Sequence, residues 1–72
     1  MQEPIMYEAN ELKYETNITF PRIVIDRYRY QDIEMVIYVL QYFFGGKYNE
    51  SRTYDKDEII KKYYKVCNEH KS

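Results

Sequence analysis

Residues 30–46 read YQDIEMVIYVLQYFFGG, and the spacing of their apolar side chains decides the predicted fold. Apolar residues recur every three or four positions, as they do along one face of a helix; these residues are Tyr30, Ile33, Ile37, Leu40 and Phe44, with Val36 and Phe43 beside them. Glycine takes the left-handed conformation that ends helices, so Gly45-Gly46 is a suitable stop. We therefore predict a helix over 30–44. The alternative is a strand, because Val, Ile, Tyr and Phe also favour strands.

A second helix is predicted after residues 47–54, which are polar and are expected to form a loop. Asp55-Lys56-Asp57-Glu58 resembles a capping box, in which Asp55 accepts from the N–H of Glu58 and Glu58 reaches back. The apolar stripe of this helix consists of Ile59, Ile60, Tyr63 and Cys67.

The residues before position 30 predict short strands. Lys13–Phe20 alternates between polar and apolar side chains, which indicates a half-buried strand, and Arg22–Asp26 indicates a second one. Pro21 separates the two because proline cannot donate a hydrogen bond to a sheet. The predicted fold is α+β: a short antiparallel β-hairpin followed by two α-helices that pack on it as a helical hairpin. Residues 1–12 form a loose N-terminal arm or an edge strand around Ile5–Tyr7, and residues 13–72 form a single small domain.

Composition limits the function. The 72 residues include ten Tyr, no Trp, two Gly and one Cys, and the net charge is −1. A core of this size supplies only about 3–5 kcal/mol, and one Cys cannot form an internal disulfide, so we expect a homo-oligomer or a hetero-complex. The small net charge draws the chain neither to nucleic acid nor to a membrane surface. The tyrosine content has two explanations, a partner-binding surface or the codon usage of an AT-rich genome.

No residue pattern indicates an enzyme. Cys67 and His70 lie three residues apart on one face of the predicted helix. That spacing would suit a thiolate–imidazole pair or half of a zinc site, but we interpret the two residues as a buried thiol and a cation near a helix end. The carboxylates of Asp55, Asp57 and Glu58 are explained by helix capping. The two glycines, Gly45 and Gly46, do not form a phosphate-binding loop. We therefore expect no catalytic residue, no metal site and no cofactor.

The cluster Arg27-Tyr28-Arg29-Tyr30 is the strongest candidate for a partner-binding site. In an extended chain, Arg27 and Arg29 project from one face and Tyr28 and Tyr30 from the other. Arg beside Tyr is typical of protein-interface hot spots, and also of surfaces that grip phosphates and stack on bases. The alternative interpretation is a corner between two elements, with the tyrosines packed inward.

The predicted first helix is apolar on nearly every side, so we expect something to cover its far side. Tyr38 and Tyr42 would lie on that exposed side and complete the predicted partner-binding set. The N-terminal arm is the alternative cover.

The order of the predicted elements resembles ribbon–helix–helix repressors, which pair a strand from each of two subunits and interlock their helices. Arg22–Tyr30 would be the ribbon, Gln31–Phe44 the first helix and Asp55–His70 the second. The resemblance implies a dimeric DNA-binding transcriptional regulator. The long segment 45–54 between the helices and the additional strand 13–20 depart from that pattern.

The leading hypothesis is a non-enzymatic protein-binding module that uses a Tyr- and Arg-rich surface. Small AT-biased chains of this kind are common in phages and other mobile elements, where many inhibit one host protein. An export signal is not visible in residues 1–12, and the longest apolar run, Met35–Leu40, is too short to span a bilayer. Together with the unpaired Cys, this predicts a cytoplasmic protein without a membrane partner.

Overall fold

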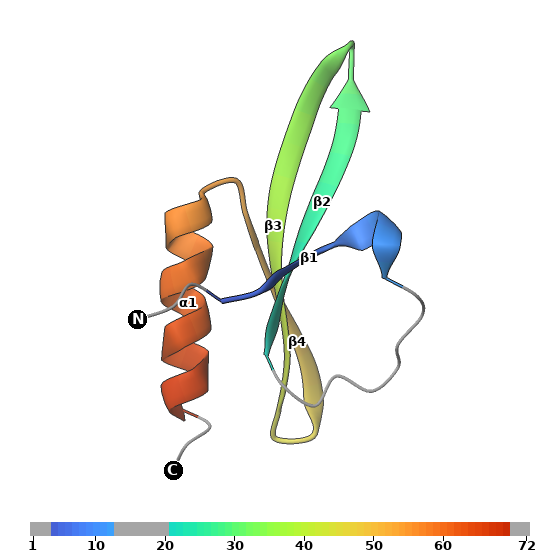
Figure 1. Cartoon of the computed structure of the whole chain (residues 1–72). Coiled ribbons are helices and arrows are strands. Elements are labelled where there is room, and N and C mark those ends of the chain that lie inside the picture. Colours follow the sequence, from blue (N-terminus) through green and yellow to red (C-terminus); the bar gives the residue numbers. More distant parts are fainter. Residues whose placement is uncertain (1–3, 13–20, 70–72) are drawn as a thin grey trace.

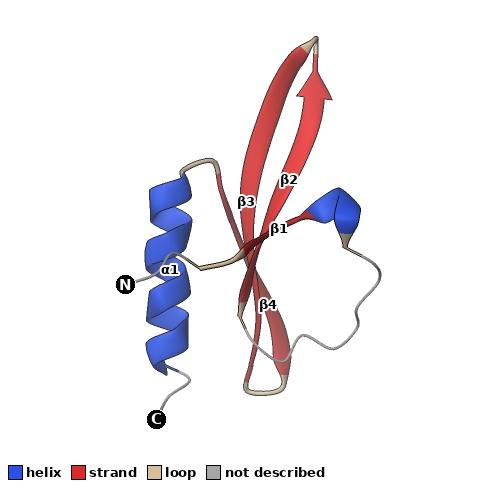
Figure 2. Ribbon diagram, in the orientation of Figure 1, coloured by secondary structure: helices blue, strands red, loops and turns tan. Residues whose placement is uncertain are grey.

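The computed structural model describes residues 4–12 and 21–69. Its elements are β1 (Met6–Glu8), the short 3-10 helix η1 (Ala9–Glu11), β2 (Arg22–Tyr30), β3 (Ile33–Phe44), β4 (Lys47–Thr53) and α1 (Lys56–Glu69). The strands form a four-stranded sheet in the order β1-β2-β3-β4, and α1 packs on one of its faces (Figures 1 and 2). The expected strand over 13–20 lies outside the described residues.

The predicted hairpin followed by two helices is wrong, because residues 33–44 form a strand of 12 residues and not a helix. Both faces of this strand are half-buried or buried over residues 35–42. A strand buried on both faces carries a nearly continuous apolar run, so its sequence does not alternate cleanly. In such a run, apolar residues also occur three and four positions apart, which is the spacing that predicted a helix. The many β-branched and aromatic residues of this segment favour the strand that forms.

Two tight turns explain why the chain forms consecutive hairpins. Gln31 and Asp32 have φ angles of 49° and 64°, and Gly45 and Gly46 have 61° and 78°. Two successive residues with positive φ form the turn whose twist matches that of the flanking strands. Gly45-Gly46 therefore joins β3 to β4 and does not end a helix. The loop predicted over residues 47–54 is likewise wrong, because β4 occupies most of it.

The β2–β3 hairpin continues beyond the rest of the sheet. β2 and β3 pair antiparallel along their whole length, from Arg22↔Gln41 to Tyr30↔Ile33. β1 pairs in parallel with Ile23–Ile25 only, and β4 pairs with residues 38–44 of β3. Within the described residues, 26–30 and 33–37 pair only with each other. We call residues 26–37 the ribbon; it projects from the top of the molecule in Figure 1.

The core lies between α1 and the sheet. Ile23, Leu40 and Ile59 have no exposed surface, and Val66 is nearly buried beside them. Ile23 and Leu40 are paired residues on β2 and β3, whereas Ile59 and Val66 lie two helical turns apart on α1. A single amphipathic helix thus covers the centre of the sheet on one side.

The helix predicted after Asp55 is confirmed. Asp55 Oδ1 accepts hydrogen bonds from the backbone N–H of Asp57 at 2.9 Å and of Glu58 at 3.4 Å. A capping box also requires the Glu58 carboxylate to accept from the Asp55 N–H, and this bond is replaced by one to Thr53. Thr53 lies between them: its hydroxyl accepts from the Asp55 N–H at 3.1 Å and donates to Glu58 Oε2 at 3.1 Å. The turn from β4 into α1 is therefore fixed by side chains.

The ribbon–helix–helix interpretation is wrong, because it needs a first helix over Gln31–Phe44 and residues 33–44 form a strand. Gln31–Phe44 contains a turn and β3, and α1 is the one α-helix among the described residues. The strand expected over Arg22–Asp26 continues to Tyr30 and pairs with β3 of the same chain. One edge of β2 is therefore paired with β3, and over Ile23–Ile25 its other edge is paired with β1.

Candidate functional site

The two faces of the sheet differ in what covers them. Side chains of a strand alternate between faces, so Ile23 and Leu40, which contact α1, define the helix face. We call the opposite face the aromatic face. Its large side chains are Tyr7, Tyr28, Tyr30, Ile33, Phe43 and Tyr48 by alternation, and Tyr54 through its contact with Tyr28.

The aromatic face holds most of the exposed apolar side chains of the described residues. Nine large apolar or aromatic side chains are exposed, and seven of them belong to this face. The other two are Ile5, which precedes β1, and Phe44, on the helix face. Tyr30 and Tyr54 are each 64% exposed and Ile33 is 61% exposed. Near the middle of the face, the pair Val24 and Val39 is buried. The exposed rings of Tyr28 and Tyr30 lie toward the turn of the ribbon, and those of Phe43 and Tyr48 lie toward the turn between β3 and β4.

Phe43 and Tyr48 form an aromatic pair beside the Gly45-Gly46 turn. They are paired residues on β3 and β4, and their ring centroids lie 5.6 Å apart with planes at 66°. This edge-to-face arrangement is favourable for cross-strand aromatic pairs. The Tyr48 hydroxyl donates to Glu50 Oε2 at 2.8 Å. Partial burial, followed by this hydrogen bond, raises the pKa of Tyr48 above its ordinary value.

Tyr28 and Tyr54 join the ribbon to the end of β4. Their hydroxyl oxygens lie 3.4 Å apart. The hydrogen bond with Tyr54 raises the pKa of Tyr28, and partial desolvation adds to the effect. The hydroxyl group of each tyrosine is therefore held by the other, while both side chains remain exposed.

The charges on the aromatic face balance. By alternation, Arg22 and Arg52 share it with Asp26 and Glu50. Arg52 Nε donates to Glu50 Oε1 at 2.6 Å. The hydrogen bond from Tyr48, together with Arg52, holds the pKa of Glu50 below its usual range. Arg22 Nε donates to Gln41 Oε1 at 2.8 Å. The face therefore presents aromatic area without a net positive or negative field.

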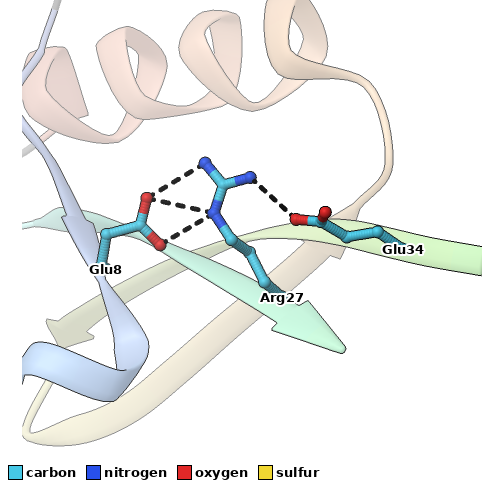
Figure 3. A network of polar contacts seen from close by, with 3 residues as sticks. All are labelled: Glu8, Arg27 and Glu34. Carbon is cyan, nitrogen blue, oxygen red and sulfur yellow. Dashed lines mark hydrogen bonds and ion pairs between the residues drawn. The ribbon is translucent and has the colours of Figure 1, made fainter. Parts of the chain in front are cut away.

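Arg27 lies on the helix-face side of the ribbon, between two carboxylates (Figure 3). Its Nε lies 3.0 Å from Glu8 Oε2, and its Nη2 lies 3.1 Å from Glu8 Oε1. Its Nη1 lies 3.4 Å from Glu34 Oε1. The hydrogen bonds and charge of Glu8, and to a smaller degree Glu34, raise the pKa of Arg27. The positive charge of Arg27 is thus matched within the chain.

The structure separates the residues of the predicted partner-binding set. Tyr28 and Tyr30 lie on the aromatic face, whereas Arg27 and Arg29 project from the other side of β2. Tyr38 and Tyr42 were expected on the exposed side of a helix. Both instead lie on β3, half-buried against the core beneath α1, because the alternation of the strand turns them toward the helix.

Sequence reasoning missed Ile33, Phe43, Tyr48 and Tyr54 as members of one surface. The signal that could have found them is Gly45-Gly46, since a two-glycine hairpin turn places Phe43 opposite Tyr48. With that hairpin in place, alternation along β3 and β2 assigns Ile33, Tyr30 and Tyr28 to the same face.

The described residues offer little else for chemistry. Within 4–12 and 21–69, no three His, Cys, Asp or Glu side chains gather closely enough to hold a metal ion. Cys67 is half-buried beside Tyr63; burial and then a hydrogen bond with this thiol raise the pKa of Tyr63. His70, which follows Cys67 by three residues in the sequence, lies outside the described residues. In this part of the chain, no helix has the length and apolar character needed to cross a membrane.

Comparison of the chain with protein-family models, with curated proteins and with solved structures finds no match.

Proposed function

We propose that this chain is a non-enzymatic protein-binding module whose contact surface is the aromatic face. The observation that supports this is the collection of seven exposed apolar and aromatic side chains on one sheet face. Exposed patches of this kind are typical of interaction sites, and tyrosine is enriched among residues that contribute most to protein–protein affinity.

The aromatic face favours a partner surface that is apolar and nearly neutral. The positive charges of Arg22 and Arg52 are offset by Asp26 and Glu50, so strong electrostatic attraction is not the basis of recognition. The tyrosine hydroxyls supply hydrogen-bond donors and acceptors among the rings, and protein interfaces combine apolar area with such polar groups. A module of this kind acts by covering part of its partner, which fits an inhibitor.

The DNA-binding alternative is less favoured by the positions of the arginines. A surface for single-stranded nucleic acid combines aromatic side chains with a positive groove. Here Arg27 and Arg29 lie on the side away from the exposed rings, and Arg27 is paired with Glu8 and Glu34. Binding to phosphates would have to break those ion pairs.

Affinity capture from the native host lysate, treated with nuclease, tests the proposal. The wild-type chain is expected to retain one protein in stoichiometric amount. The double variant Tyr30→Asp/Tyr54→Asp places charges on the two most exposed rings of the aromatic face and is expected to lose that protein. Phe44→Asp is the matched control, because Phe44 is 53% exposed but lies on the helix face; it should retain the protein.

Two results would contradict the proposal. The first is equal capture by the wild-type chain and the double variant, with loss in the Phe44→Asp variant. The second is retention of the chain on DNA in a salt-dependent manner with no captured protein, which would favour nucleic-acid binding.

A further inference from the structure

Tyr28 and Tyr54 meet through their hydroxyl groups although they come from strands that are not neighbours. Tyr28 lies on β2, and Tyr54 directly follows Thr53, the last residue of β4. β3 separates these two strands in the sheet. The hydroxyl oxygens nevertheless lie 3.4 Å apart, so the two side chains reach each other across β3. The fold therefore brings together two phenol groups that are 26 residues apart in the sequence.

Both phenol groups are open to solvent. The Tyr54 side chain is 64% exposed and that of Tyr28 is 37% exposed, so an oxidant in solution can reach either ring. In each ring the Cε carbons are bonded to the carbon that carries the hydroxyl. The contact that joins the two hydroxyls therefore also brings Cε carbons of the two rings close together. When a phenol loses one electron and one proton, the unpaired electron is shared between its oxygen and these carbons.

We propose that Tyr28 and Tyr54 form an oxidative modification site, at which a haem peroxidase with hydrogen peroxide joins the two rings as dityrosine. Each phenol loses one electron and one proton, and the two radicals form a bond between a Cε carbon of Tyr28 and a Cε carbon of Tyr54. The hydrogen on each of these carbons then moves as a proton to the phenol oxygen of its own ring, which restores both aromatic rings. The two electrons and two protons that leave the phenols reduce one hydrogen peroxide to two water molecules.

The product resembles the contact from which it forms. In dityrosine the two hydroxyls flank the new bond, so they stay neighbours and the rings move little. Holding two reacting groups together makes their reaction much faster than an encounter between separate molecules. A bond within one chain is therefore favoured over dimers formed through another exposed ring, such as that of Tyr30.

A second tyrosine pair among the described residues is less suited to this reaction. Tyr63 and Tyr64 lie edge to face, with ring centroids 5.6 Å apart and planes at 76°. The Tyr63 hydroxyl forms a hydrogen bond with the Cys67 thiol, and a thiol can return a hydrogen atom to an oxidised phenol. Oxidation of Tyr63 is thus reversed by its neighbour, whereas Tyr28 and Tyr54 have each other as partners.

The cross-link fastens the ribbon to the turn between β4 and α1. Within the described residues, 26–30 and 33–37 have no other strand beside them, so the contact between Tyr28 and Tyr54 is an attachment of the ribbon to a more distant part of the chain. A covalent bond at this point closes the chain from residue 28 to residue 54 and reduces the freedom of the unfolded state. The modification concerns the chain alone and does not depend on the protein-binding function.

Peroxidase treatment of the full chain in dilute solution tests the site. A haem peroxidase with hydrogen peroxide is expected to give dityrosine fluorescence in the monomer band of a denaturing gel. After digestion with trypsin, mass spectrometry should find Tyr28-Arg29 joined to Thr53–Lys56, with the mass of the two peptides less two hydrogen atoms. Tyr28→Phe and Tyr54→Phe should each lower the monomer fluorescence about tenfold or more, because each removes one of the two phenols that the fold holds together.

Tyr30→Phe is the matched control, because Tyr30 is as exposed as Tyr54 and lies on the same face; this variant should keep the monomer fluorescence. In urea that unfolds the wild-type chain, the joined peptides should fall to the level of the Tyr54→Phe variant. Absence of the joined peptides from the folded chain would overturn the proposal. So would an equal yield of these peptides in urea, or fluorescence that Tyr30→Phe removes and Tyr54→Phe leaves unchanged.

Discussion

Arg27 on β2 holds Glu8 on β1 through two parallel hydrogen bonds, with Nε 3.0 Å from Oε2 and Nη2 3.1 Å from Oε1. Glu8 is the last residue of β1, and its backbone pairs with Ile25, two residues before Arg27. The ion pair therefore extends the attachment of a strand that has only three backbone pairs. β1 in turn supplies Tyr7 to the aromatic face, so this contact helps to position one edge of the proposed binding surface.

The first prediction concerns this ion pair. Arg27→Gln is expected to destabilise the whole chain little, because the Arg27 side chain is 49% exposed and exposed ion pairs contribute little. Its effect should be local: backbone amides of Met6–Glu8 should exchange with solvent faster, while those of β3 and β4 keep their rates. Hydrogen exchange followed by NMR measures this. Arg29→Gln, two residues along the same strand, is the control, and equal acceleration by both variants would contradict the role of Arg27.

The second prediction concerns the hydroxyl contact between Tyr28 and Tyr54. Because the hydrogen bond with Tyr54 raises the pKa of Tyr28, Tyr54→Phe should lower that pKa toward the ordinary value for tyrosine. A raised folded-state pKa stabilises the fold below the unfolded pKa and loses that contribution as the pH rises through the folded value. As the pH rises through the range in which tyrosine titrates, the free energy of unfolding of the variant should therefore fall less than that of the wild-type chain. NMR titration of the labelled Tyr28 ring carbon bearing the hydroxyl measures the shift. An unchanged Tyr28 pKa would exclude the contact.

The third prediction concerns the core. Ile59 has no exposed surface, whereas Ile5 is 73% exposed. Removing one methyl group from a buried isoleucine costs about 1 kcal/mol, which lowers the Tm of a domain of this size by about 4–8 °C. Ile59→Val should show this loss in thermal unfolding followed by circular dichroism. Ile5→Val removes the same group from an exposed position and should change Tm little; equal effects would show that Ile59 is not in the core.

The fourth prediction concerns the ribbon turn. Gln31 and Asp32 both have positive φ, which costs non-glycine residues about 1–2 kcal/mol each. Asn-Gly is the preferred pair for this turn, so Gln31→Asn/Asp32→Gly should raise the free energy of unfolding by about 1 kcal/mol. Urea denaturation measures the change. The same two substitutions would destabilise the chain if residues 31–32 formed part of a helix, because the glycine would weaken it.

The sequence predicted the elements whose signals are local. The helix predicted after Asp55 is confirmed. It could be predicted because Asp55 caps its N-terminus and because apolar residues such as Ile59 recur on one face among polar residues. β3 was predicted as a helix because its apolar residues do not alternate with polar ones. The structure explains this pattern, since α1 covers one face of β3 while Val39 is buried on the other. The run from Met35 to Leu40 therefore had to be apolar at successive positions, which removed the alternation that marks a strand.

The aromatic face could be predicted only in part for the same reason. Tyr28 and Tyr30 were singled out from a local pattern of four residues. Their neighbours Phe43 and Tyr48 join them only through strand pairing, which depends on the Gly45-Gly46 turn. Tyr54 reaches the face through one contact between side chains far apart in the sequence. Periodicity within a single segment carries no information on such contacts.

Tyrosine footprinting tests most directly the claim that the aromatic face is the surface a partner covers. The chain is nitrated alone and in complex with the captured protein, and the reactivity of each tyrosine is read by peptide mass spectrometry. The account predicts that Tyr30, Tyr48 and Tyr54 lose reactivity in the complex while Tyr64 on α1 keeps its own. Loss of reactivity at Tyr64, with Tyr30, Tyr48 and Tyr54 unchanged, would contradict it.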